Sequence, residues 1–581
     1  MGKYNIPDSV KNDDFAFFRK SLDELVSGKI TKDDFKAIRV PFGVYEQRER
    51  ETYMVRLKTY GGEITPNQLK ILADYADKYA NNKLHITTRG GIQLHYVKLE
   101  NLCEIIENLH SIGLTSRGSG GATVRNINAD ILSNIAKDCV FDVLPYANAL
   151  TTKMLGLKDS FYLPKKFKIA FSASSADRAM ATITDIGFIA KMKGSKKGFE
   201  VWVAGGMGTT PRLGFKLLDF LPDDEVFIIA QAAKQIYDKY GDRERKSKAR
   251  FRFVAEKYGE AELAKMILDE ANIIKTQGNY KLTLESSPIL PPLNKDDFVI
   301  PAMSEAQKTW WNRFVIPQAQ NGYFCVKVPL TLGDIDSTLA RDLANLMENR
   351  GNIFFAPNQN MYLRNLKAKD LLALYDIITQ ISPQSKKSSI IGDMVACTGA
   401  ATCQLGIARP RGAILEIEKY LSDKHIDLDL LQGFKIQFSG CPNSCGNHFS
   451  ANLGFFGKAL RKDKDIYPAY NVVVGGIVSA DENKKSRFAK QIADISAFHL
   501  PEFVYRVLQT YIAKRAKYPH FEDFVDNEGE SEIIKIAQDL KEIPSISEDS
   551  TPYYDYTSDR LFSETYKERG KGEEYFKQIK G

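Results

Sequence analysis

The sequence predicts an α+β protein built from two diverged copies of one unit. Three observations predict it: short motifs that return in the same order, an alternation of strand and helix patterns within each copy, and a length of 581 residues. That length suits three or four domains better than a single core. Hydrophobic residues make up 43% of the chain and charged residues 26%, which excludes a largely disordered protein.

The duplication is visible as four markers in register. Phe167–Ser172 returns as Phe434–Ser439, 267 residues later (434 against 167). The other pairs are Ile186–Phe188 with Leu453–Phe455, Val203–Gly206 with Val473–Gly476, and Gly62–Ile64 with Gly333–Ile335, at offsets of 267, 270 and 271. One strand or turn motif recurs by chance in many proteins, but four in one order indicate an internal repeat.

Both copies open with the same succession of elements. In the first, Tyr53–Lys58 alternates like a strand, Gly61 and Gly62 make a turn, and Thr65 with Pro66 suits the start of a helix. The pattern also predicts a helix body with Leu69, Leu72, Ala73 and Ala76, strands near 84–87 and 92–97, and, from Tyr323 onward, a helix near 337–347 and strands near 352–355 and 361–363. Two such units around a pseudo-twofold axis leave a cleft between them, where cofactors usually bind.

Charge and hydropathy limit the partners. The formal net charge is +7, which suits an acidic partner or anionic ligands but does not by itself indicate nucleic acid. The first thirteen residues are polar, and no apolar run approaches the roughly 20 residues that a membrane helix needs. We therefore expect a cytoplasmic protein with no membrane and no nucleic-acid partner.

Four of the seven cysteines lie close together in the sequence. Cys397 and Cys403 are separated by five residues, and Cys441 and Cys445 by three. Four thiolates from two segments are the ligand set of a 4Fe–4S cluster. If Pro442 starts a helix, two of these thiols face its positive end. In a reducing compartment such cysteines are not a disulfide framework.

Two alternatives to a cluster remain open from the residues alone. A structural zinc site usually has pairs separated by two or four residues, so this spacing is atypical of zinc. Buried structural thiols would leave the clustering unexplained. The other three cysteines, Cys103, Cys139 and Cys325, are expected to be ordinary core or surface residues. The first copy has Ala173–Arg178 where the second has Gly440–Cys445, so only one copy carries the thiols.

The motifs A-C-T-G-x-x-x-C and G-C-P-N-S-C-G resemble those of the sirohaem-containing sulfite and nitrite reductases, and the resemblance covers about residues 38–515. It implies one sirohaem and one 4Fe–4S cluster, with Cys445 bridging the cluster to the sirohaem iron. It also implies two ferredoxin-like half-domains related by a pseudo-twofold axis and two larger α/β domains that bind sirohaem and cluster. The expected divisions are an N-terminal wrapping segment (1–50), a first half-domain (51–118), a first sirohaem-binding domain (119–310), a second half-domain (311–385), a cluster domain (386–520) and a peripheral tail (521–581).

The resemblance also assigns residues to the macrocycle, whose carboxylates need basic and amide donors. Those implied are Thr87, Thr88, Arg89, Gln93 and His95 from the first copy and Asn358, Gln359 and Asn360 from the second. Many relatives carry polar residues where this chain has Gly90 and Gly91. Taken alone, Arg89 would fit an ordinary solvated arginine.

Four basic residues match the family's anion-binding positions: Arg56, Arg125, Lys166 and Lys168. On a strand, Lys166 and Lys168 would point to one side, and two ammonium groups side by side repel unless an anion lies between them. A basic edge strand is the alternative. The family tends to carry Lys at position 168 for sulfite and Asn for nitrite, so we expect sulfite as substrate with nitrite as the alternative.

The donor of electrons is expected to be another protein. The sequence has no dinucleotide-binding glycine motif after a strand and no room for a flavin domain. A ferredoxin suits the basic charge balance, and a separate flavoprotein is the alternative. A non-catalytic iron–sulfur or sirohaem protein also remains open at this stage.

Overall fold

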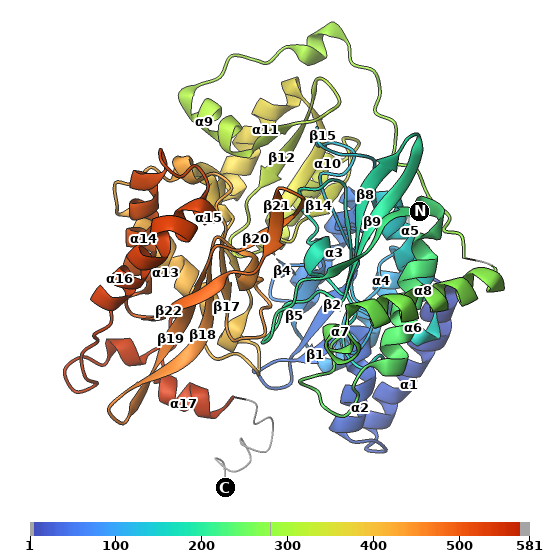
Figure 1. Cartoon of the computed structure of the whole chain (residues 1–581), viewed down its shortest axis with the longest axis horizontal. Coiled ribbons are helices and arrows are strands. Elements are labelled where there is room, and N and C mark those ends of the chain that lie inside the picture. Colours follow the sequence, from blue (N-terminus) through green and yellow to red (C-terminus); the bar gives the residue numbers. More distant parts are fainter. Residues whose placement is uncertain (1–4, 279, 570–581) are drawn as a thin grey trace.

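The computed structural model describes residues 5–278 and 280–569. This part of the chain forms two small and two large five-stranded sheets and one two-stranded ribbon. The large sheets lie on either side of the small ones, with the second-copy sheet in orange and the first-copy sheet in teal (Figure 1). Among the described residues, no helix combines the length and apolarity that a bilayer span requires.

The two small sheets exchange a strand. Their orders are β1-β2-β5-β4-β13 and β11-β12-β15-β14-β3, so β13 of the second copy completes the first sheet and β3 of the first copy completes the second. All neighbours are antiparallel. The strands are β1 (Val44–Glu46), β2 (Tyr53–Leu57), β3 (Glu63–Ile64), β4 (Lys83–Ile86), β5 (Ile92–Val97), β11 (Val315–Pro317), β12 (Tyr323–Val328), β13 (Asp334–Asp336), β14 (Ile353–Phe355) and β15 (Met361–Lys367).

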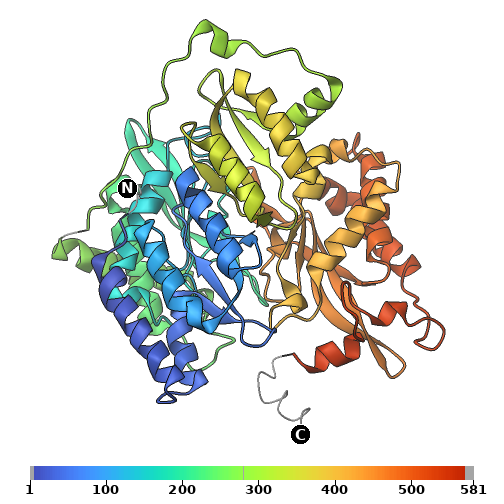
Figure 2. The same ribbon diagram turned by 180° about the vertical axis from the view of Figure 1, so that it is seen from behind.

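The helices of these units start where the sequence indicates. Thr65 caps α3 (Pro66–Tyr79) in a reciprocal capping box with Gln68. The equivalent α10 (Ser337–Met347) is capped by Asp336. First-copy helices in blue and second-copy helices in yellow cover the small sheets from behind (Figure 2). The others are α1 (Phe15–Val26), α2 (Lys32–Arg39), α4 (Leu102–Ser111), α9 (Glu305–Phe314) and α11 (Ala368–Ile381).

The two large sheets confirm the repeat. Their orders are β10-β9-β8-β7-β6 and β16-β17-β18-β19-β22. In the first, Phe171 stacks on Phe188 at 4.7 Å, and in the second Phe438 stacks on Phe455 at 4.5 Å. Both pairs are related by the offset of 267 residues that the sequence markers share, so the register of the duplication extends into the cores.

The bounds of the remaining elements follow chain order. The strands are β6 (Asn128–Ala129), β7 (Ile169–Ser172), β8 (Ile186–Lys193), β9 (Lys196–Val203), β10 (Phe215–Pro222), β16 (Val395–Ala396), β17 (Ile436–Ser439), β18 (Leu453–Lys462), β19 (Asp465–Val474), β20 (Ile477–Asp481), β21 (Lys484–Arg487) and β22 (Lys490–Ser496). The helices are α5 (Leu144–Leu155), α6 (Val226–Tyr240), α7 (Arg252–Tyr258), α8 (Glu260–Gln277), α12 (Ser389–Gly392), α13 (Pro410–Ser422), α14 (Leu500–Lys514), α15 (Phe521–Phe524), α16 (Glu530–Asp539) and α17 (Phe562–Lys567).

The C-terminal segment differs from the expected peripheral tail. Phe521, Phe524 and Ile533 are buried in the core of the large second-copy unit, together with Phe438 and Leu453 of its sheet. Their helical spacing is hidden in a composition rich in Glu and Lys, which is why the sequence suggested a tail. Residues 570–581 lie outside the described residues.

This packing predicts a stability cost for Ile533→Ala. The side chain is fully buried, so truncation should lower the free energy of unfolding by about 2–5 kcal/mol. Urea unfolding followed by tyrosine fluorescence measures the effect. Lys535→Ala, an exposed change on the same helix, should leave the midpoint unchanged; equal midpoints for both variants would contradict the packing.

Candidate active site

The loop after β4 and the loop after β17 meet, although they belong to different copies. Thr88 Oγ1 donates a hydrogen bond to the carbonyl oxygen of Cys445 at 3.0 Å. Thr87 Oγ1 accepts from the backbone N–H of Gly91 at 3.0 Å, which fixes the turn. Two segments that the sequence singled out separately are thus brought into direct contact.

Steric contacts explain why Gly90 and Gly91 are glycines in the loop after β4. Gly90 has φ +64°, and a Cβ there would lie 2.6 Å from the Phe355 carbonyl oxygen of the other copy. A Cβ on Gly91 would lie 2.9 Å from the carbonyl oxygen of Leu57. Close approach of the other copy therefore accounts for glycine at position 90, and close approach of β2 in the same copy accounts for it at position 91.

Arg89 is partly buried and its guanidinium is bonded to backbone carbonyl oxygens, so it is not an ordinary solvated surface arginine. Its Nη2 donates to the carbonyl oxygens of Asn126 at 2.8 Å and Ile169 at 3.1 Å. Asn126 returns a hydrogen bond from Nδ2 to the Arg89 carbonyl oxygen at 2.9 Å. Burial, reinforced by Arg125, lowers the pKa of Arg89 to about 9.

Gln93 and His95 face one side of β5, as alternation predicts. With the Gln93 amide oxygen turned toward Arg56, that oxygen lies 2.7 Å from Nη2 and 2.8 Å from Nε, and the amide nitrogen donates to His95 Nε2 at 3.1 Å. Burial lowers the pKa of His95 to about 3, so its imidazole is neutral at physiological pH. Strands β2 and β5 thus bring the Arg56 guanidinium, the Gln93 amide and the neutral His95 imidazole together.

Two of the four basic residues share an acceptor. Arg56 Nη1 and Arg125 Nη2 both donate to the carbonyl oxygen of Ser119, at 3.3 Å and 2.7 Å. Lys166 and Lys168 do not lie on a strand, because β7 begins only at Ile169. The expectation that both lysines point to one side of a strand is therefore wrong, and so is the alternative of a basic edge strand.

The electrostatics of this region favour an anion. Burial lowers the pKa of Lys166 to about 8 and that of Lys168 well below its ordinary value, with Arg89 and Lys166 adding repulsion at Lys168. Arg125 and both lysines are only partly buried. Crowded positive groups of this kind attract a negatively charged ligand.

The four cysteines lie at the ends of β16 and β17. The Gly440 backbone N–H donates to Cys397 Sγ at 3.1 Å. Burial raises the pKa of Cys397, Cys403 and Cys441, and Cys445 is close enough to raise each of them further. Four neighbouring thiols with a backbone N–H on sulfur fit a 4Fe–4S cluster, whose irons replace the thiol protons. Within the described residues no three Cys, His, Asp or Glu side chains are arranged to hold a single metal ion.

The segment after Cys441 is a series of turns and not a helix. Ser444 and Asn447 have φ of +54° and +61°, which a helix does not allow. Gly446 N–H donates to Ser439 Oγ at 3.0 Å, and a Cβ on Gly446 would lie 1.8 Å from the Phe438 carbonyl oxygen. The expected helix dipole at Pro442 is therefore absent, and turns present the thiols instead.

The second-copy loop is more deeply engaged with protein than expected. Gln359 donates from Nε2 to the Ile86 carbonyl oxygen at 3.0 Å and accepts from Ala396 N–H at 3.1 Å. Asn360 donates to the Gly392 carbonyl oxygen at 2.9 Å and accepts from Leu330 N–H at 2.9 Å. The amide groups of Gln359 and Asn360 are both buried and fully hydrogen-bonded to protein. In this structure the two residues position the loop. Asn358 keeps partial exposure.

Sequence reasoning missed two buried arginines beside the lysines. Arg250 Nη2 binds the Asp185 carboxylate at 2.8 Å and 3.1 Å, and Asp185 also accepts from Lys168 N–H at 2.9 Å. Arg252 Nη1 donates to the Met207 carbonyl oxygen at 3.3 Å, and burial lowers its pKa to about 10. The alternation of Arg250 and Arg252 was the available sequence signal for these residues. Their relation to Lys166 and Lys168 was not visible, because the two pairs lie far apart along the chain.

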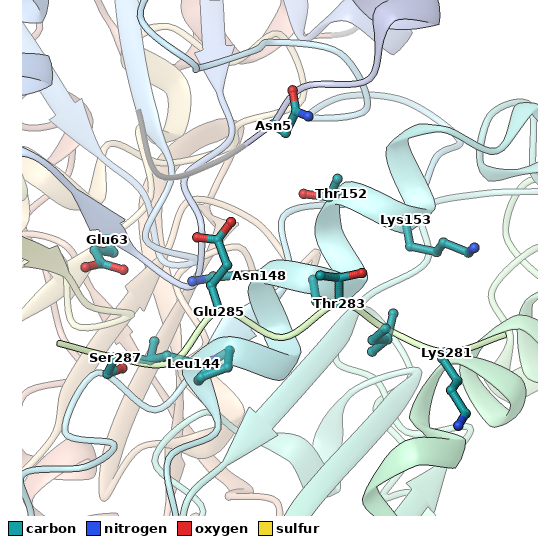
Figure 3. A pocket seen from close by; sticks show the side chains of 13 residues that line it. Asn5, Glu63, Leu144, Asn148, Thr152, Lys153, Lys281, Thr283, Glu285 and Ser287 are labelled. Carbon is teal, nitrogen blue, oxygen red and sulfur yellow. The ribbon is translucent and has the colours of Figure 1, made fainter. Parts of the chain in front are cut away.

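A separate cavity of about 440 Å³ lies between α5 and the extended connector after α8. Figure 3 shows Asn148 and Thr152 of α5 facing Thr283 and Glu285 of the connector. None of the residues expected to bind cofactor or anion lines it. It therefore does not belong to the candidate active site.

The fold is a duplicated α+β architecture in which one copy carries four neighbouring thiols and the other carries a group of basic side chains. The chain belongs to the nitrite and sulfite reductase family. The description "Nitrite and sulphite reductase 4Fe-4S domain" matches residues 120–275 and 388–543, and "Nitrite/Sulfite reductase ferredoxin-like half domain" matches residues 45–112 and 316–381.

Curated relatives carry both substrate names. An assimilatory ferredoxin-dependent nitrite reductase of Haloferax mediterranei is 25% identical, covering 89% of this chain and 90% of that protein. A sulfite reductase (ferredoxin) 1 of Mycolicibacterium paratuberculosis is 25% identical, covering 80% of each. The structure of Mycobacterium tuberculosis NirA superposes with a TM-score of 0.73 at 23% identity, covering 89% of this chain and 94% of that chain, which shows the shared fold.

The chain is accordingly an oxidoreductase that uses a 4Fe–4S cluster and a sirohaem. The thiol set fits the cluster, so the zinc and non-catalytic alternatives are not retained. The cationic lining formed by Arg89, Arg125 and Lys166 fits a ring that carries carboxylates.

Cys397→Ala should abolish cluster assembly, because a cube held by three thiolates loses one iron ligand. The purified variant should lack visible cluster absorbance and acid-labile sulfide. Cys103→Ala removes a thiol outside the cluster loops and should keep both. A full complement of iron and sulfide in Cys397→Ala would contradict the ligand assignment.

Proposed function

We propose that this chain catalyses the six-electron reduction of sulfite to sulfide, with electrons from a separate protein such as a ferredoxin. The observation that carries the choice of sulfite is Lys168. In the unliganded chain burial lowers the pKa of Lys168 well below its ordinary value, and a bound dianion favours its charged form. As an ammonium group, Lys168 adds a fourth positive charge beside Arg56, Arg125 and Lys166, and sulfite approaches a dianion whereas nitrite carries one charge.

The chain's own residues bind, orient and protonate. The bound cofactors supply the electron transfer and an open iron position for the substrate. Arg56 and Arg125 are held together by the Ser119 carbonyl oxygen and offset the charge of the anion. Because burial lowers the pKa of Lys166 to about 8, its ammonium group releases a proton more readily than an exposed lysine does.

Nitrite reduction to ammonia is the second candidate. The Haloferax mediterranei relative is named a nitrite reductase, and the same cationic site accepts either anion. Discrimination then depends on charge, because both substrates are small oxyanions.

Lys168→Asn should shift the substrate preference toward nitrite. Loss of one ammonium group from the site should lower kcat/KM for sulfite relative to nitrite by about five- to tenfold, equivalent to about 1 kcal/mol. Sulfide and ammonia formation by the holoenzyme measure the ratio.

Lys165→Asn is the matched control, because it removes the same charge from a lysine whose Nζ donates to the Lys246 carbonyl oxygen at 2.8 Å. The ratio of kcat/KM for sulfite to kcat/KM for nitrite should be the same in Lys165→Asn as in the wild type. An unchanged ratio in Lys168→Asn would remove the support for sulfite.

A positive surface around the first cysteine pair supports an acidic protein donor. Arg48 donates from Nε to the Cys403 carbonyl oxygen at 3.0 Å and from Nη2 to the Gly406 carbonyl oxygen at 3.1 Å. Arg569 Nε donates to the Leu405 carbonyl oxygen at 2.9 Å. Burial lowers the pKa of Arg48, with Cys403 and Glu568 opposing this effect and Arg409 and Arg569 adding to it, so three arginines and one glutamate meet here. Cys403 is exposed at the centre of this surface.

Arg569→Glu should weaken turnover with ferredoxin. The charge reversal should raise KM for ferredoxin several-fold at low salt, and the defect should shrink as ionic strength screens the charges. Lys70→Glu makes the same change on the exposed face of α3 and should have no effect. Equal KM values for both variants, or an equal defect with methyl viologen as donor, would contradict a docking role.

A further inference from the structure

Tyr45, on β1, stands beside two arginines of the anion site. The Arg56 Cζ lies 5.3 Å from the centroid of its ring. Its hydroxyl oxygen accepts a hydrogen bond from the Gly121 backbone N–H at 2.7 Å. Arg125 and Arg56 are both near enough to lower the pKa of this hydroxyl, against the effect of burial. Because the Gly121 N–H donates to this oxygen and the described residues show no acceptor for the hydroxyl's own hydrogen, that hydrogen is available to an oxygen of a bound ligand.

The ring is held in place by bare backbone. A Cβ on Gly120 would lie 2.8 Å from Tyr45 Cε2 and 3.0 Å from its hydroxyl oxygen, and 2.1 Å from the Val40 carbonyl oxygen. Glycine at this position therefore lets the phenol lie against the segment that leads to Arg125. Placement of this kind fixes the hydroxyl relative to both guanidinium groups.

We propose that Tyr45 is a further catalytic residue of this site, whose hydroxyl donates a hydrogen bond and then a proton to an oxygen of the oxyanion held by Arg56 and Arg125. This inference rests on the proposed function. Arg56 and Arg125 hold the substrate, whereas Tyr45 supplies a hydroxyl that can lose its proton and regain it.

The proton balance is simple. Sulfite takes up six electrons from the protein donor and seven protons to give hydrosulfide and three waters. In the step assigned to Tyr45, its O–H bond breaks and a new O–H bond forms on a substrate oxygen, which leaves as water after a second protonation. The phenolate is held by Gly121 N–H and Arg56 and regains a proton from water.

The charges that face Tyr45 suit this role. Arg39 from α2, Arg56 from β2 and Arg125 from the loop after Gly121 are the charged groups that interact with it. Burial alone would raise the pKa of Tyr45, but Arg125 and Arg56 with the Gly121 hydrogen bond outweigh burial and hold the pKa below its ordinary value of about 10. The phenolate is thereby stabilised, which makes the hydroxyl a better acid.

The first experiment compares wild-type holoenzyme with Tyr45→Phe, with reduced methyl viologen as donor. We expect kcat to fall about ten- to a hundredfold, as for loss of a general acid, with KM for the anion within threefold. Tyr53→Phe is the matched control, because its ring also lies 5.3 Å from an arginine Cζ, that of Arg39. Its kcat should stay at the wild-type value. Wild-type kcat in Tyr45→Phe would overturn the proposal.

The second experiment keeps the hydroxyl and changes its acidity. With 3-fluorotyrosine at position 45, the alkaline limb of the kcat profile should move to lower pH, which a merely structural hydroxyl would not cause. Ultraviolet difference titration of wild type against Tyr45→Phe should show one tyrosinate forming below pH 10. An unmoved limb, or no such tyrosinate, would overturn the proposal.

These outcomes are distinct from failure of the proposed function. If wild-type holoenzyme reduces neither sulfite nor nitrite, the proposed function is wrong and the Tyr45 proposal falls with it. If wild-type turnover is normal and both Tyr45 experiments give wild-type profiles, only the role of Tyr45 is wrong.

Discussion

The exchange of β3 and β13 between the two small sheets is the constraint on which the site depends. Ile64 of β3 pairs with Ile353 of β14, and Asp334 of β13 pairs with His85 of β4. The second pairing is reinforced by a contact of 2.8 Å between His85 Nδ1 and Asp334 Oδ1. Each copy covers a sheet edge of the other, so neither has a complete sheet alone. The loop after β4 is thereby held against the other copy and reaches Cys445.

Duplication provided two equivalent loops, and divergence gave them different chemistry. The position equivalent to Cys445 is Arg178, whose guanidinium contacts Asp138 at 2.7 Å and Asp130 at 3.2 Å. These ion pairs stabilise the first-copy loop, whereas the second-copy loop presents thiols that can bind iron. The residues proposed to bind the anion lie on the first copy. In the proposed active site both copies therefore take part, with the thiols on one side and the basic residues on the other.

Local signals predicted much of the fold and part of the site. Thr65, Pro66 and the apolar spacing of α3 predicted that helix because capping and periodicity act within a few residues. The turn after Cys441 was not predictable in the same way, because Ser444 and Asn447 take left-handed conformations that tertiary contacts impose. Arg250 and Tyr45 come from distant segments, and only the folded chain shows that they lie beside Lys168 and Arg56. The contact between Thr88 and Cys445 spans both copies and has no local signal.

The charge distribution explains why the site needs anionic ligands as part of its structure. Arg250 is buried and Lys168 and Arg89 are partly buried beside it, and Asp185 is a carboxylate that acts on all three. Buried like charges destabilise a fold unless opposite charges accompany them. The carboxylates of a sirohaem and the charge of an oxyanion supply that compensation, and any ligand that binds only the folded chain also stabilises it. Binding of the cofactor, recognition of the substrate and stability of the interface between the copies are therefore linked through the same cluster of positive charges.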